Sequence, residues 1–280
     1  IALIDWKTGK EVASRKLLNK TFYYGHSVFS KSGDKILSSV VQPAKARAII
    51  EVLDFPSFKV LDEIEIERGI VHEIALLANN KFVFGLTPFY SLEQKPGFGF
   101  FDLGTRRAEY IEIPFAGKKA VFSHLQINRN QILGEIFEDL PTESLRLPAA
   151  QSHVTRLLSL DLNTHAVTEI RDPELKNAIQ EVSTQALSLA VDETEDTLWV
   201  SFPDLAKIQV WNLKDSGLLE TLTFPMENAP RGVVLDAETG RMLVSTEKSV
   251  MVFDSRSRKP ITNLALPTSG YCAHLRFTLA

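Results

Sequence analysis

The sequence predicts an all-β fold, because one strand-and-turn motif recurs along its 280 residues. In each copy, two or three apolar residues end in Asp or Asn and a polar turn follows, as in a strand that enters a hairpin. The copies end at Asp5, Asp54, Asp102, Asp161, Asn212 and Asp254, separated by 49, 48, 59, 51 and 42 positions. A period of about 40–50 residues is typical of β-propellers, whose blades are four-stranded antiparallel sheets.

A second motif predicts the first strand of each blade and the turn after it. Its copies start at His26, His72, His124, Ser188, Gly232 and His274. The last copy follows every Asp or Asn motif, so the chain opens on the final strands of one blade and closes on a first strand. Propellers close their ring in this way, with the two termini sharing or flanking a blade so that its edges are protected.

Together the two motifs predict a single propeller domain over residues 1–280. We expect five complete blades between two partial ones, with the boundaries 1–20, 22–68, 70–116, 121–172, 184–225, 229–267 and 271–280. The two end segments are too short to complete one another. We therefore expect a seven-bladed ring with residues missing at both ends, and a six-bladed ring with one thin blade is the alternative.

The charge balance argues against polyanionic partners. Lys and Arg total 31 and Asp and Glu total 35, a net charge of −4, so no basic field is available for nucleic acid or anionic lipid. No apolar run approaches the roughly 20 residues that span a bilayer, and we expect no membrane span. The single cysteine, Cys272, excludes an intrachain disulfide and a zinc site made of cysteines alone.

Four of the six histidines fall at one position of the repeat, the start of the first strand: His26, His72, His124 and His274. First strands of propeller blades line the central channel, so these side chains should form a ring. In one interpretation they are structural and tie blades together by hydrogen bonds, as the Gly-His pair of WD-type repeats does. In the other, two or three of them with water bind a transition metal, an anionic ligand or a group of a haem-bearing partner.

Three further residues are secondary candidates for such a site. Ser188 occupies the histidine position of another blade, and Cys272 lies two residues before His274 and so on the same strand face. Glu73 follows His72, but strand alternation predicts that its side chain points away from the channel. The recurring Asp residues are expected to organise turns. No Ser-His-Asp arrangement can be assembled, and we assign no catalytic and no cofactor-binding residue.

Several segments resemble the DUF1513 family of bacterial proteins. They are Phe22 to Ser30, Val71 to Ile74, Ser188 to Asp192 and Cys272 to His274, and the most specific is Tyr24-Gly25-His26 followed by Val28-Phe29-Ser30. The resemblance implies an exported, periplasmic seven-bladed propeller whose gene accompanies those of imelysin-like and dihaem-peroxidase-like proteins of iron acquisition. The chain departs from the family in having a shorter insertion at Leu86 to Gly97 and no additional N-terminal blade portion.

The first functional hypothesis is a non-enzymatic, periplasmic and monomeric propeller that acts as a binding or scaffold protein in metal handling, with iron as the metal. The channel histidines would hold a transition metal ion or a small ligand, and loops on one rim, about residues 87–97 and 138–153, would dock a protein partner. One alternative is an enzyme of the lactonase type or a subunit of a quinone-dependent dehydrogenase. Another is a purely structural protein interaction module.

Overall fold

The computed structural model describes residues 2–4, 10–17, 22–42, 47–66, 69–77, 81–88, 95–117, 120–139, 153–171 and 185–265. The chain divides into two compact units, residues 1–125 and 126–280. Within the described residues the only helical segments are two 3-10 turns, η4 (Pro203–Leu205) and η5 (Met226–Asn228). No helix in this part of the chain is long and apolar enough to cross a membrane.

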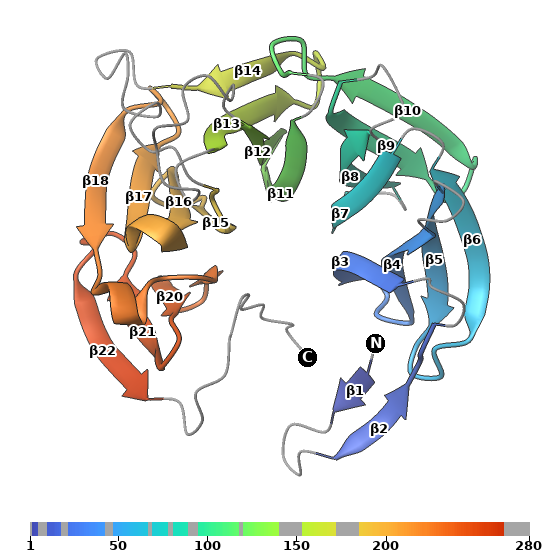
Figure 1. Ribbon diagram of the computed structural model, residues 1–280, viewed down its shortest axis with the longest axis horizontal. Coiled ribbons are helices and arrows are strands. Elements are labelled where there is room, and N and C mark those ends of the chain that lie inside the picture. The colour runs from blue at the N-terminus through green and yellow to red at the C-terminus, as the bar shows by residue number, and fades with distance from the viewer. Residues whose placement is uncertain are drawn as a thin grey trace. The chain divides into compact units, whose positions relative to one another are not determined.

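The first unit contains a two-stranded sheet, β1-β2, and two four-stranded antiparallel sheets, β3 to β6 and β7 to β10 (Figure 1). In each sheet, strands that follow one another in the chain are hydrogen-bonded neighbours. The strands are β1 (Ala2–Ile4), β2 (Glu11–Ser14), β3 (Phe22–Phe29), β4 (Lys35–Gln42), β5 (Arg47–Asp54), β6 (Val60–Ile66), β7 (Gly69–Leu76), β8 (Lys81–Pro88), β9 (Gly97–Asp102) and β10 (Arg107–Glu112). The first unit ends within β11 (Val121–Asn128), the first strand of the next sheet.

The remaining strands form three more four-stranded sheets: β11 to β14, β15 to β18 and β19 to β22. Their bounds are β12 (Gln131–Asp139), β13 (His153–Asp161), β14 (Val167–Ile170), β15 (Ser188–Asp192), β16 (Thr197–Phe202), β17 (Lys207–Asn212), β18 (Leu218–Thr223), β19 (Val233–Asp236), β20 (Arg241–Ser245), β21 (Ser249–Asp254) and β22 (Pro260–Ala265). Five four-stranded antiparallel sheets in chain order confirm the predicted propeller fold. The number of blades stays a prediction, because residues 266–280 lie outside the described part.

The middle strands of the sheets are more buried than the last strands, which alternate between inward and outward side chains in β6 and are fully exposed in β22. All but the two end residues of β4 are buried, as is every residue of β16, whereas every residue of β22 is exposed. In the first unit Ile50 and Ile64 of one sheet share an apolar cluster with Ile74 and Phe84 of the next. The two sheets therefore pack face to face, and removal of this apolar surface from water stabilises the unit by about 25 cal/mol per Å².

The recurring Asp residues organise the turn between the third and fourth strands. Oδ1 of Asp102 accepts the backbone N–H groups of Gly104 and Thr105 at 2.8 and 3.0 Å. Asp161 and Asp254 bind the N–H groups of their own turns in the same way. The structural interpretation is therefore confirmed for Asp102, Asp161 and Asp254, whereas Asp5 lies outside the described residues.

A regularity of these turns has no signature in the sequence. In the five of these turns that the structure describes, the residue four positions after the Asp or Asn adopts a left-handed backbone, with φ between 53° and 62°, and none of these five residues is glycine. They are Phe58, Arg106, His165, Ser216 and Arg258. In four of the five turns the N–H of this residue donates to the backbone carbonyl of the Asp at 2.8–2.9 Å. Tertiary context therefore holds a conformation that local preference disfavours.

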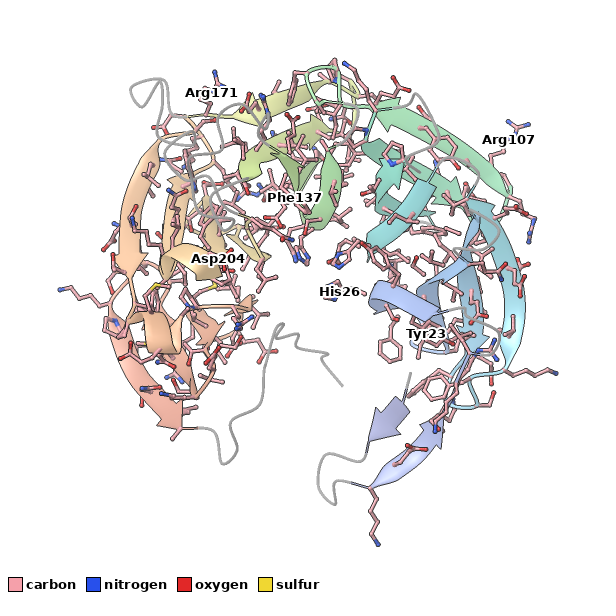
Figure 2. All side chains as sticks on the ribbon, in the orientation of Figure 1. Tyr23, His26, Arg107, Phe137, Arg171 and Asp204 are labelled. Atoms are coloured by element: carbon pink, nitrogen blue, oxygen red, sulfur yellow. The ribbon has the colours of Figure 1, made fainter. Side chains whose placement is uncertain are left out.

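A buried carboxylate joins the two-stranded sheet to the first four-stranded sheet. Glu51 on β5 is 3% exposed and accepts two hydrogen bonds from the Arg15 guanidinium, at 2.8 and 3.1 Å. The hydroxyl of Tyr23 donates to the same carboxylate at 3.2 Å, and Figure 2 labels this tyrosine. Burial, followed by the negative charge of Glu51, raises the pKa of Tyr23 to about 12. The hydrogen bonds from Arg15 and Tyr23 thus compensate Glu51 for its lost hydration, as a buried carboxylate requires.

Replacement of Glu51 by Gln is expected to lower the free energy of unfolding by about 1–3 kcal/mol, because Arg15 and Tyr23 lose a charged acceptor while the side-chain shape is kept. It should also lower the pKa of Tyr23, since one of the charges that raise it is gone. Chemical denaturation and ultraviolet titration of the phenol measure the two effects. The control is Glu63→Gln, at an exposed position of β6. It should change the free energy of unfolding by less than about 0.5 kcal/mol. Equal losses in the two variants would contradict the role of Glu51.

The pKa values of the turn carboxylates predict that the fold loses stability in acid. Hydrogen bonds from their turns, chiefly from Thr105, Thr164 and Ser257, lower the pKa values of Asp102, Asp161 and Asp254. The folded chain therefore binds these protons more weakly than the unfolded chain. The stabilisation is complete above the ordinary Asp pKa of about 3.9 and is lost as the pH falls through the lower folded values.

We expect this acid loss to be shallower when the three Asp residues are replaced together by Asn. Asn keeps an acceptor oxygen, as Asn212 shows by accepting the N–H of Lys214 at 2.8 Å. Urea unfolding at several values between about pH 2 and pH 6 compares the two proteins. An unchanged slope in the triple variant would show that other groups control acid unfolding.

Candidate metal centre

Four side chains that can bind a metal gather where the first strands of three successive sheets lie close together. His26 comes from β3, His72 and Glu73 come from β7, and His124 comes from β11; one ligand atom of each lies within 4.8 Å of the others. Figure 2 labels His26 beside the ribbons of β3 and β7. All four residues belong to the first unit. Three of the four predicted histidines are therefore brought together.

Gly25 allows β3 to approach β7 at this point. Its φ is +77°, and a Cβ atom built on it would lie only 1.8 Å from the carbonyl oxygen of His72. No side chain fits in that space, so the two backbones are in direct contact. The contact places His26 next to His72, with ring centroids 5.2 Å apart and ring planes at 80°.

Irregular pairing in both strands directs the side chains into the cluster. The register of β3 with β4 shifts between Tyr23 and Ser27, and that of β7 with β8 shifts between Val71 and Ile74. A regular strand points successive side chains to opposite faces, and a bulge breaks this alternation. His72 and Glu73 consequently both reach the cluster. The expectation that Glu73 points away was wrong because it assumed an unbroken strand.

The carboxylate of Glu73 lies among the imidazoles. Its Oε2 is 3.2 Å from Nδ1 of His124 and 3.8 Å from Nε2 of His26. The rings of His124 and His72 are 5.0 Å apart between centroids, and those of His124 and His26 are 5.4 Å apart. A carboxylate removed from water needs partners that donate or carry positive charge, and imidazoles supply both.

The four members differ in exposure, and we call the two buried ones, Glu73 and His124, the closed side and the two more exposed ones, His26 and His72, the open side. The side chains of Glu73 and His124 are 4% and 6% exposed, whereas that of His26 is 14% exposed and His72 is only partly buried. An ion bound here would thus be shielded behind Glu73 and His124. It would be reached from the side of His26 and His72.

A hydrogen bond fixes how His72 presents its ring. Nδ1 of His72 lies 3.1 Å from the backbone carbonyl oxygen of Ser123. A carbonyl can only accept, so Nδ1 carries the proton and the lone pair is on Nε2, which is the usual arrangement of a metal-binding histidine. The same bond connects β7 to β11. His72 therefore makes the blade-connecting bond of the structural interpretation and also has the tautomer that metal binding needs.

Thr87 on β8 holds β11 in position. Its hydroxyl accepts the N–H of Phe122 at 2.9 Å and lies 3.3 Å from the carbonyl oxygen of the same residue. The ring of Phe122 packs edge-on against Phe98, with centroids 4.9 Å apart. Ser123 and His124 follow directly along the strand. Nothing in the sequence marked Thr87, because a lone threonine in a strand has no distinctive spacing.

The other predicted residues are placed differently. Ser188 lies on β15 in the second unit, where its hydroxyl accepts the N–H of Val233 at 3.1 Å. It connects β15 to β19, as the structural interpretation of this repeat position expects. Cys272 and His274 lie outside the described residues, as do 89–94 and 140–152, which are most of the two predicted rim loops.

The donor set suits a divalent transition metal. Imidazole nitrogens with one carboxylate bind zinc, copper, iron and nickel, whereas magnesium and calcium prefer oxygen ligands alone. Metal–nitrogen bonds of about 2.0–2.1 Å place tetrahedral donors about 3.4 Å apart. The ligand atoms of the four residues lie within 4.8 Å of one another. Small side-chain movements therefore bring them to the separation that a bound metal requires.

Comparisons with known proteins bear on the fold alone. No protein-family model and no curated protein matches the chain. The chain is similar to a propeller in a solved structure titled "Crystal structure of Nidogen/Laminin Complex", with a TM-score of 0.56 and 10% identity. The match covers 87% of this chain and 80% of that one. Membership of DUF1513 stays a prediction.

The contact at Gly25 predicts a difference between two glycine substitutions. Gly25 and Gly33 both have positive φ, +77° and +72°, but only Gly25 has neighbours within 4 Å of a built Cβ. Gly33→Ala should cost about 1–2 kcal/mol of stability, the price of a left-handed alanine. Gly25→Ala should cost about 1–3 kcal/mol more, because β3 must move from β7. Denaturant unfolding measures both, and equal losses would show that the close approach does not matter.

Proposed function

We propose that this protein is a metal-binding β-propeller whose functional centre is the group of His26, His72, His124 and Glu73. The observation that supports this function is that ligand atoms from three separate strands lie within 4.8 Å of one another. Residues 26, 72 and 124 are far apart in sequence, so no local turn brings them together. Only the packing of consecutive sheets does so, with the aid of Gly25 and two strand irregularities.

The ion is a divalent first-row transition metal. Three imidazoles exclude the hard cations as preferred occupants, and affinity among the remaining metals generally rises from manganese through iron to copper. The supply of metal in the compartment therefore decides which ion is bound. Handling of iron in the periplasm is our specific proposal, and it rests on the resemblance of Tyr24 to Ser30 and the associated segments to DUF1513.

The protein acts by binding and not by catalysis in this proposal. A lactonase-type site would combine several acidic and amide side chains with the histidines. The described group of ligand residues contains one carboxylate, Glu73, beside its three histidines. The donor set is therefore that of a metal carrier or a metal-dependent docking site, and a propeller surface offers room for a protein partner beside it.

Metal analysis of the purified full chain tests this function. After chelator treatment and reloading with zinc, or with iron(II) without oxygen, we expect one ion per chain. His72→Ala and His26→Ala should each weaken binding by more than about 100-fold, beyond the loss caused by changes outside the ligand set. An ion at 100 times its Kd should raise the free energy of unfolding by about 2.7 kcal/mol in the unmodified protein.

The matched control is His165→Asn, which removes a histidine on a turn after β13 and keeps a residue type that tolerates the left-handed φ of 57°. It should bind metal normally. His72 also connects β7 to β11, so far-ultraviolet circular dichroism must show that each variant is folded. Metal content far below one ion per chain in the unmodified protein, or unchanged affinity in both folded histidine variants, would refute the proposal.

A further inference from the structure

We propose that the bound metal is held by the three imidazoles alone, keeps a coordination position open, and takes a small anionic oxygen or nitrogen donor there, with Glu73 positioning His124. This inference rests on the proposed metal-binding function and specifies the ligand class of the same site. It concerns how the ion is coordinated, which the grouping of four ligand atoms leaves open.

The hydrogen bonds define which nitrogen each ring presents. Nδ1 of His72 donates to the carbonyl of Ser123, so the lone pair of the neutral ring is on Nε2, which is the nitrogen that can bind the ion. Nδ1 of His124 lies 3.2 Å from Oε2 of Glu73, and an ionised carboxylate can only accept. In that tautomer the lone pair of His124 is on Nε2 as well, which makes Nε2 the nitrogen that can bind the ion. His26 already directs Nε2 toward the cluster, where it lies 3.8 Å from the same carboxylate oxygen.

Glu73 therefore acts through His124. A metal-binding histidine that donates its other N–H to a carboxylate is a recurrent arrangement, which fixes the ring and makes the coordinating nitrogen more basic. Glu73 is almost completely buried, at 4% exposure, and comes from an irregular part of β7. Glu73 and His124 are the two most buried members of the cluster.

Three protein ligands leave a position for an exogenous one. Closed structural sites use four protein ligands, whereas sites with three keep the fourth position for water or substrate. The open side of this cluster is lined by His26 and His72, the two more exposed members. The vacant position of the ion should face this side, because the buried pair occupies the other.

Charge selects the class of exogenous ligand. A divalent ion with three neutral imidazoles carries +2, and Glu73 reduces the charge of the centre to +1. A monovalent anion such as a carboxylate, hydroxide or azide brings the total to zero, which favours its binding at a partly buried site. A neutral apolar ligand would gain nothing from the ion.

Cobalt(II) substitution tests the inference, because the visible absorption of cobalt responds to coordination number and ligand type. We expect azide, and then acetate, to change the spectrum of the cobalt-loaded full chain saturably. Glu73→Gln should keep one cobalt per chain, the band pattern and the azide response, with about 10–100-fold weaker metal affinity. His165→Asn should behave as the unmodified protein does.

Two results would overturn the inference and leave the metal-binding function intact. One is a cobalt spectrum that does not respond to azide or acetate, which would indicate a closed site. The other is a changed band pattern in Glu73→Gln, which would show that Glu73 is a direct ligand. Failure of the unmodified chain to load cobalt, zinc or iron would instead refute the metal-binding function, and this inference with it.

Discussion

The contact between the backbones of β3 and β7 at Gly25 is the constraint on which the candidate site depends. Two strands of different sheets can approach to van der Waals contact only where one has no side chain. At this point the cost of a left-handed residue is avoided by glycine, and the carbonyl of His72 occupies the space of a Cβ atom. The distance between His26 and His72 follows from this contact.

A second requirement is that both strands depart from regular pairing at the same place in the repeat. The irregularities of β3 and β7 lie at Tyr24-Gly25-His26 and at His72-Glu73. Strand bulges are frequent beside functional sites because they redirect side chains without interrupting the sheet. Here they place adjacent residues of one strand in a single cluster. The β-sheet thus holds the strands rigidly, and its local irregularities redirect the side chains that form the cluster.

The repeat could be recognised from sequence because it depends on simple chemistry. Asp and Asn end the third strand of each sheet since their side chains bind turn N–H groups, and this leaves a regular spacing. The alignment of His26, His72 and His124 followed from the same spacing. Glu73 and Thr87 could not be assigned, because a bulge and a contact between sheets are set by the packing of distant segments. The left-handed turn residues were missed for a similar reason, since Phe58 or Arg106 has no local preference for that backbone.

Ser188 shows that a residue other than histidine can connect neighbouring sheets at this repeat position. A hydroxyl there makes the connection between neighbouring sheets that His72 makes with its ring, but it has no second nitrogen to offer. Blades of one chain can therefore share a mechanical role at this position while only some of them acquire chemistry. A ligand that binds imidazoles from consecutive blades links modules that are otherwise joined by packing and by a few hydrogen bonds. Its binding energy would resist their separation, so an occupied site would hold the sheets of β3, β7 and β11 together more firmly than an empty one.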